Sequence, residues 1–206
     1  MGIKLRILSW WTPEWFLKRG LNELALSTTG GLEGVLLGEN LKSDRVNSLH
    51  NIHLKGNLDE RRKNMAITHN ELVQTMINSM GRDKSIELGR KAMFKEGLSL
   101  GHKFRNILGV SNKVEDLIAA SKILYKVLGI EFSVKEINNT NNDTEMLMII
   151  NRCTLSEFYT SDTCRILSAA DEGVVQGLNP HIKMNFTERI TEGAQCCLAS
   201  LYLEDL

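Results

Sequence analysis

Proline, aromatic residues and an excess of charge of either sign are scarce or missing from this sequence of 206 residues. Only 2 prolines and 16 glycines occur, which excludes collagen-like and proline-rich chains. Aromatic residues make up 6%, so the core must rely on leucine, isoleucine, valine and methionine. Because 25 basic residues balance 25 acidic ones, the composition predicts no general attraction to nucleic acid or to an anionic membrane. What remains is the composition of a globular domain.

Long apolar runs are also missing. No stretch approaches the ~20 residues that span a bilayer, and the first ten residues do not form a secretory signal. We therefore expect a cytoplasmic protein with reduced thiols. Four cysteines gather near the C-terminal end, at Cys153, Cys164, Cys196 and Cys197. In a reducing compartment such a group is more typical of metal binding or catalysis than of disulfides.

The balanced charge is unevenly distributed. Residues 1–142 carry a net charge of +6, and residues 143–206 carry −6. These opposed halves are expected to pack on each other or on a second copy. All three tryptophans lie at Trp10, Trp11 and Trp15, where they form either a plug on the main domain, a lid or a dimer contact. Together these features favour a two-fold homodimer.

The order of elements predicts an α+β fold in which a largely antiparallel sheet with a C-terminal hairpin packs against several helices. Residues 1–64 are interpreted as an aromatic-rich helical extension and polar connector, and residues 65–206 as the main domain. The expected helices cover 65–80, with His69 on its surface, 84–108, 111–128 and 162–176. The expected strands lie near 130–134 and 144–152, with a hairpin over 182–203. Gly89, Gly97 and Gly101 interrupt the second helix, which indicates that another helix or a ligand approaches it closely.

Glu188 breaks the apolar alternation of the hairpin. It is in register with Met184 and Phe186, so we expect its side chain to face the core, opposite Cys197. Cys196 should then face the other way. A buried carboxylate is either paired for structural reasons or an acid–base group with a raised pKa.

Cys164 and Asp171 stand two turns apart on one face of the expected helix 162–176. With Cys153 at the end of the preceding strand and Cys197, they would form a site for a divalent metal ion, zinc or manganese, or for a nucleophile with an acid–base partner. The cysteine spacings match no standard zinc motif, so buried structural cysteines remain the alternative. Among the dispersed histidines, His102 is the best placed to reach a site.

An ordered series of short motifs is more specific. It runs from Asn151-Arg152-Cys153, through Cys164 and Asp171-Glu172, to Asn179-Pro180 and the final Glu192-Gly193-Ala194-Gln195-Cys196-Cys197. This series resembles the L-2-amino-thiazoline-4-carboxylic acid hydrolase family, and more distantly the 4-vinyl reductase domain. The resemblance is best over 143–206 and absent over 1–64. Thr154 stands where that family usually has proline.

The resemblance implies an enzyme that opens a small sulfur- and nitrogen-containing ring by adding water across a C=N bond. Cys164 or Cys197 would then supply a thiolate or a metal ligand, Asp171 and Glu188 would transfer protons, and Arg152 or Arg165 would bind the substrate carboxylate. Two other functions stay open. The alternatives are a sensor domain that binds a small ligand or a metal without turnover, and an accessory subunit of a larger complex.

Overall fold

The computed structural model describes residues 5, 7–8, 11–39, 54–138 and 144–203. Trp10 and residues 139–143, between the two expected strands near 130–134 and 144–152, lie outside these ranges. In chain order the elements are α2 (Glu14–Gly38), α4 (Leu58–Met80), α5 (Arg82–Leu108), α6 (Val114–Leu128), β1 (Ile130–Asn138), β2 (Thr144–Cys153), the 3-10 turn η1 (Thr154–Glu157), α7 (Ser161–Leu178), β3 (Ile182–Glu188), the 3-10 turn η2 (Ile190–Glu192) and β4 (Cys197–Leu203). The predicted α+β class is confirmed.

Helix α4 begins earlier than the sequence pattern suggested. Asn57 accepts a hydrogen bond from the Glu60 backbone, and the Glu60 carboxylate accepts one from the Asn57 backbone. This capping box satisfies two amide groups that would otherwise lack partners at the helix start. The polar run after residue 58, which we expected in a connector, is therefore the first part of the helix.

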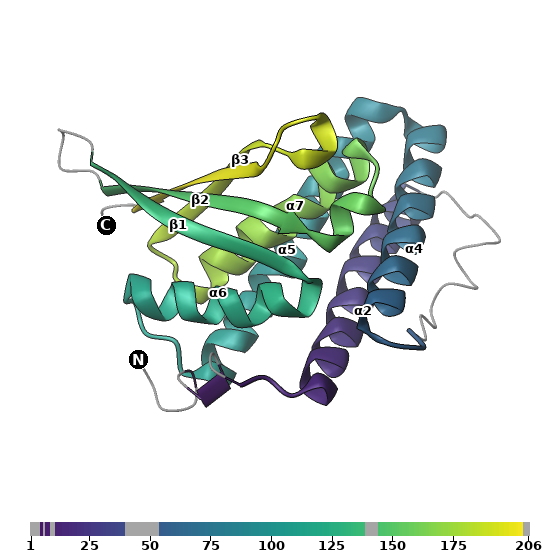
Figure 1. Ribbon diagram of the computed structural model, residues 1–206. Helices are drawn as coiled ribbons and strands as arrows, with labels where there is room; N and C mark the ends of the chain where they lie inside the picture. Colours follow the sequence, from purple (N-terminus) through teal and green to yellow (C-terminus); the bar gives the residue numbers. More distant parts are fainter. Residues whose placement is uncertain (1–4, 6, 9–10, 40–53, 139–143, 204–206) are drawn as a thin grey trace.

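The described strands form a four-stranded antiparallel sheet in the order β1-β2-β4-β3. Side chains alternate along β2, so that Met146, Met148 and Ile150 are buried while Leu147 and Ile149 are half-buried. Helices α5, α6 and α7 lie on one side of the sheet in Figure 1, with α6 against β1 and α7 against β3. The core therefore lies between the sheet and these helices.

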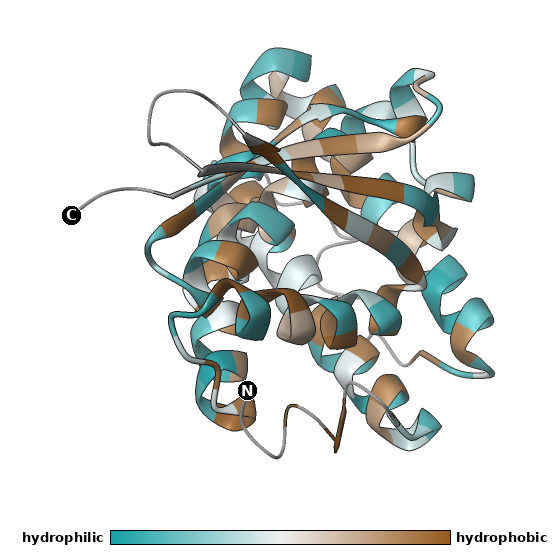
Figure 2. Cartoon of the chain, turned by 60° about the vertical axis from the view of Figure 1, so that its left-hand side comes forward, coloured by the Kyte–Doolittle hydropathy of each residue, from teal (hydrophilic) through white to brown (hydrophobic). Residues whose placement is uncertain are grey.

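Helix α2 packs against α4, α5 and α6 beside the end of the sheet (Figure 1). Its Leu17 and Leu21 belong to the same buried cluster as the inner face of the sheet. Trp11 and Trp15, in contrast, are 65% and 66% exposed. The helices alternate between brown and teal in Figure 2, as expected for elements with one face buried and the other in water. Among the described residues, no helix has the length and hydropathy needed to cross a membrane.

Helices α5 and α7 make the most extensive contact between helices. A Cβ built on Gly97 would lie 2.0 Å from the Ala170 carbonyl oxygen, and one on Gly173 would lie 2.2 Å from the Phe94 carbonyl oxygen. Only glycine allows the two backbones to approach this closely. The close neighbour anticipated from the glycines of 84–108 is thus another helix.

Replacing Gly97 by alanine should destabilise the protein by roughly 2 kcal/mol or more, because the new methyl group meets backbone rather than a flexible side chain. Gly34 of α2 is the matched control, since a Cβ there has no neighbour within 4 Å. Gly34→Ala should leave stability unchanged or raise it by up to about 1 kcal/mol. Urea unfolding of both variants provides the measurement, and equal effects would contradict the close contact.

Candidate functional site

A cavity of about 80 Å³ lies inside the molecule, where α7 faces α2, α4 and the start of β1. Leucine, isoleucine, methionine, valine and alanine form most of its wall. The polar or ionisable side chains in the wall are those of Thr28, His69, Cys153, Tyr159, Cys164 and Asp171. A largely apolar cavity with a few convergent polar groups is the typical form of a small-molecule site.

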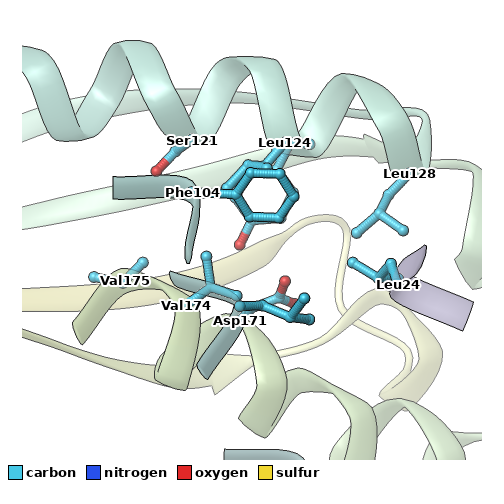
Figure 3. Close-up of a pocket in the computed structure, with 10 residues that line it drawn as sticks. Leu24, Phe104, Ser121, Leu124, Leu128, Asp171, Val174 and Val175 are labelled. Atoms are coloured by element: carbon cyan, nitrogen blue, oxygen red, sulfur yellow. The ribbon is translucent and has the colours of Figure 1, made fainter. Parts of the chain in front are cut away.

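Asp171 belongs to a second, smaller space as well. This space, of about 30 Å³, lies between α7 and α6, and Figure 3 shows Asp171 below Leu124 and Leu128 of α6. Leu24, Leu100, Leu128 and Val174 border both spaces together with Asp171. Asp171 is half-buried and faces both spaces.

The environment of Asp171 favours its protonated form. Burial raises the pKa of its carboxyl to about 7, the neighbouring Glu172 adds to the increase, and Tyr125 opposes it weakly. The Tyr125 hydroxyl is buried beside Asp171 without forming a well-aligned hydrogen bond with any described residue. Glu172 itself is held by Arg90 at 2.7 Å. Among the residues that the structure describes, no basic side chain forms an ion pair with Asp171, and with a pKa of about 7 its two protonation states are nearly equally populated at neutral pH.

His69 lies in the cavity wall and is fully buried, which corrects our expectation that it sits on the helix surface. Burial lowers the pKa of its imidazole to about 3, so the ring is neutral. Its Nε2 lies 2.9 Å from Thr28 Oγ1, and its Nδ1 lies 2.8 Å from the Tyr159 hydroxyl. We did not expect this hydrogen-bonded group from the sequence. The helical spacing of His69 from the buried Met65 and Met76 is the signal that points to it.

Three of the cysteines influence one another. Burial raises the pKa of the Cys153 thiol to about 12, and smaller increases come from Cys164 and Cys197. Burial likewise raises the pKa values of the Cys164 and Cys197 thiols. Cys153 and Cys164 line the cavity, whereas Cys197 lies under the sheet, where its Sγ accepts a hydrogen bond from the Ile190 amide at 3.3 Å. All three are therefore protonated near neutral pH, and a protonated thiol is a poor nucleophile and a poor metal ligand.

The expected metal centre does not fit this arrangement. In the part of the chain that the structure describes, no three His, Cys, Asp or Glu side chains are placed to hold a metal ion. A structural zinc site needs four ligands, with its cysteines as thiolates.

Glu188 does not face the core, contrary to our expectation. A bulge between Phe186 and Glu188 inserts an extra residue into β3, so Glu188 is exposed and pairs with Leu198 instead of Cys197. The inward position passes to Arg189, which is 7% exposed. Its guanidinium donates to Ser168 Oγ at 3.1 Å and covers the Phe186 ring.

The remaining predicted residues lie outside the cavity wall. Arg152 is exposed on the outside of β2, within 3.7 Å of Glu131. Arg165 forms an ion pair with Glu192 at 2.7 Å. His102 is exposed on α5. Of the residues that we expected in the site, the structure brings together Cys153, Cys164 and Asp171 in one cavity.

The comparisons with known proteins agree with the motif series. The sequence profile of the L-2-amino-thiazoline-4-carboxylic acid hydrolase family matches residues 60–200, so the chain belongs to this family. The match extends well beyond 143–206, where the motifs are clearest. The sequence matches no curated protein.

Two solved structures are similar in fold. Subunit 3 of a trafficking protein particle complex from Naegleria fowleri, covalently bound to palmitic acid, matches with a TM-score of 0.53 and 15% identity, over 70% of this chain and 95% of that one. The phenol-responsive sensory domain of the transcription activator PoxR, with phenol, has a TM-score of 0.48 and 13% identity, over 67% of this chain and 74% of that one. At these identities the first likeness shows a shared fold.

Asp171 and His69 make opposing contributions to stability as the pH changes between about 3 and 7. Between about pH 4 and 7, folded Asp171 holds a proton that the unfolded chain has lost, so raising the pH destabilises the fold. Between about pH 3 and 6.5, folded His69 lacks a proton that the unfolded chain binds, so raising the pH stabilises it. Asp171→Asn removes the first contribution and leaves the second.

The free energy of unfolding of Asp171→Asn should therefore rise relative to wild type as the pH increases from about 4 to 7, by about 1.4 kcal/mol for each pKa unit of the shift. Denaturant unfolding at several pH values measures this difference. Glu157→Gln, at an exposed carboxyl, should give a difference that does not vary in this way. A pH-independent difference for Asp171→Asn as well would show that Asp171 has an ordinary pKa.

Proposed function

We propose that this member of the L-2-amino-thiazoline-4-carboxylic acid hydrolase family hydrolyses a small cyclic amidine in the cavity beside α7, with Asp171 as the acid–base group. The observation that carries the proposal is a buried carboxyl with a pKa of about 7, facing an otherwise mainly apolar space. A general acid–base group works best when its pKa lies near the operating pH. The family match supports the reaction class.

A cyclic amidine suits this environment chemically. Its ring is compact and partly apolar, which fits walls of leucine, valine and methionine. Its two nitrogen atoms can donate hydrogen bonds to a carboxylate, and a charged amidinium would supply the basic partner that Asp171 lacks among the described residues. Binding such a cation would lower the Asp171 pKa and leave a carboxylate ready to accept a proton from water.

The reaction can be written so that one carboxyl performs two proton transfers. Asp171 accepts a proton from water as the water oxygen bonds to the amidine carbon, and the C=N bond becomes a single bond. The carbon–sulfur bond then breaks, and the proton on Asp171 passes to the departing sulfur. The new hydroxyl group becomes the carbonyl by releasing its proton to solvent, which balances the positive charge of the bound amidinium. The product has one molecule of water more than the substrate and one new thiol. Cys153 and Cys164, as protonated thiols, shape the wall rather than attack.

Substrate size requires some opening of the site. The cavity of about 80 Å³ is smaller than the ~150 Å³ that encloses one benzene molecule. The space beyond Asp171 is separated from it by shared side chains such as Leu24 and Val174, and rotation of these chains would join the two. For the substrate carboxylate, Arg189 is a buried cation near the cavity, close enough that its charge partly offsets the effect of burial, which raises the pKa of Cys164 in the cavity wall.

A second candidate function is ligand binding without turnover. The closed and largely apolar cavity favours it, because a sensor needs affinity and no exchange of water. The palmitic acid attached to the trafficking-complex subunit is a much larger ligand. A cavity of about 80 Å³ does not hold a sixteen-carbon chain, so we consider only small ligands. An assembly role would instead use the exposed Trp11 and Trp15.

Turnover separates these functions. We expect the wild-type protein to convert L-2-amino-thiazoline-4-carboxylic acid into a thiol-containing product, detected by mass spectrometry, with kcat/KM changing around pH 7. Asp171→Asn should lower kcat by about 10²–10⁴-fold, because it removes the acid–base group and keeps the shape. Glu157→Gln serves as the control and should behave as wild type.

Two outcomes would contradict hydrolysis at this site. Calorimetric binding of the compound with no product would favour the sensor. Product formation by Asp171→Asn at the wild-type rate would place the chemistry elsewhere.

A further inference from the structure

Thr28, His69 and Tyr159 form a chain of hydrogen bonds that crosses from α2 through α4 to the segment before α7. Thr28 is 1% exposed and His69 is fully buried. All three side chains line the same cavity as Asp171. None of these three side chains holds the helices together through an ion pair. Each occupies a position in the cavity wall where an apolar residue could be buried at a lower desolvation cost.

The positions of the hydrogens follow from counting donors. The Thr28 hydroxyl has one hydrogen, and its Oγ1 lies 2.8 Å from the Leu24 carbonyl oxygen, the usual acceptor for a threonine within a helix. If Thr28 donates to Leu24, its contact with His69 requires a hydrogen on Nε2. A neutral imidazole carries only one N–H, so Nδ1 is then an acceptor.

Tyr159 must consequently donate its hydrogen to His69 Nδ1, at 2.8 Å. Burial raises the pKa of Tyr159 well above its usual value, so the hydroxyl keeps this hydrogen. The oxygen of Tyr159 is left with lone pairs and no hydrogen to offer elsewhere. It therefore presents an acceptor, and not a donor, to a molecule in the cavity.

The backbone on both sides of Tyr159 is held to α4. The Asn70 side chain donates to the Phe158 carbonyl oxygen at 2.8 Å and accepts from the Thr160 amide at 3.3 Å. Asn70 follows His69 directly, so one turn of α4 fixes both the main chain and the hydroxyl of Tyr159. Such fixed geometry on a rigid element is what a recognition group requires.

We propose that Tyr159 accepts a hydrogen bond from an N–H group of the cavity ligand, and that His69 and Thr28 are positioning residues that hold it in the acceptor state. This assignment rests on the proposed function, since it assumes that the ligand occupies the cavity. With Asp171 as the second acceptor, the site selects compounds with at least two N–H donors, such as amidines and guanidines. Ligands that offer only carbonyl or ether oxygens are disfavoured.

The hydrogen positions can be measured without any ligand. In ¹⁵N NMR spectra of the labelled protein at neutral pH, His69 Nε2 should appear as a protonated nitrogen and Nδ1 as an unprotonated one. His69→Gln identifies the His69 signals, and His181→Gln, at a histidine outside the cavity, is the control for the assignment. If Nδ1 carries the hydrogen instead, His69 donates this hydrogen bond to the Tyr159 oxygen, and the proposal is wrong.

The ligand contact is tested with L-2-amino-thiazoline-4-carboxylic acid and with acetamidinium as a smaller probe. Tyr159→Phe should weaken the binding of both by roughly three- to tenfold, measured by calorimetry, because it removes one acceptor and keeps the ring. His69→Gln should raise KM more than it lowers kcat, which a purely structural role would not do. Thermal melting of each variant reports folding separately.

The outcomes distinguish this proposal from the proposed function. If Asp171→Asn abolishes turnover while Tyr159→Phe binds both probes as wild type does, the Tyr159 contact is wrong and hydrolysis stands. If Tyr159→Phe weakens binding but the wild-type protein forms no product, the contact stands and hydrolysis is wrong. If neither probe binds the wild-type protein, both are wrong.

Discussion

The direct backbone contact between α5 and α7 is the constraint on which the rest of the structure depends. Gly97 and Gly173 remove the side chains that would separate the two helices, so carbonyl groups of one helix lie against the backbone of the other. Glycine lowers the stability of each helix by about 1 kcal/mol per residue, and close packing must offset this cost. This contact fixes the position of α7 relative to α5 and to the sheet above it.

The fixed position of α7 explains how an acidic residue can be buried. The glycines of α7 lie on the face that packs against α5. Cys164 and Asp171 lie on another face, which points toward α2, α4 and α6. Asp171 cannot move to solvent without breaking the glycine contact. It therefore remains in an apolar environment that raises its pKa to about 7. A raised pKa of this kind is more typical of functional sites than of structural carboxylates.

The sequence predicts the regular parts of this fold and fails where one residue changes the pattern. Alternation and helical spacing identified the C-terminal hairpin, the strand near 144–152 and the shared face of Cys164 and Asp171. A single bulge in β3 reversed the predicted direction of Glu188, and bulges leave little trace in an apolar–polar pattern.

The cavity is harder to predict because its wall comes from elements far apart in the chain. Thr28, His69 and Tyr159 lie on three such elements, and the hydrogen bonds between them appear only after the helices are packed. We expected His69 on the helix surface although its apolar neighbours on α4 are a signal of burial, and no local pattern indicates its partners. Burial also decides the protonation of the cysteines, which are protonated thiols here rather than the thiolates that their clustering in the sequence suggested.

The central claim is that a small molecule is bound inside the protein, between Asp171 and Tyr159. A crystal structure of Asp171→Asn soaked with L-2-amino-thiazoline-4-carboxylic acid tests it most directly, because this variant should retain the substrate instead of consuming it. The account predicts density for the compound in an enlarged cavity, with nitrogen atoms within hydrogen-bond distance of residue 171 and of the Tyr159 oxygen. An unchanged, closed cavity with the compound bound at the outer surface near Arg152 would contradict it.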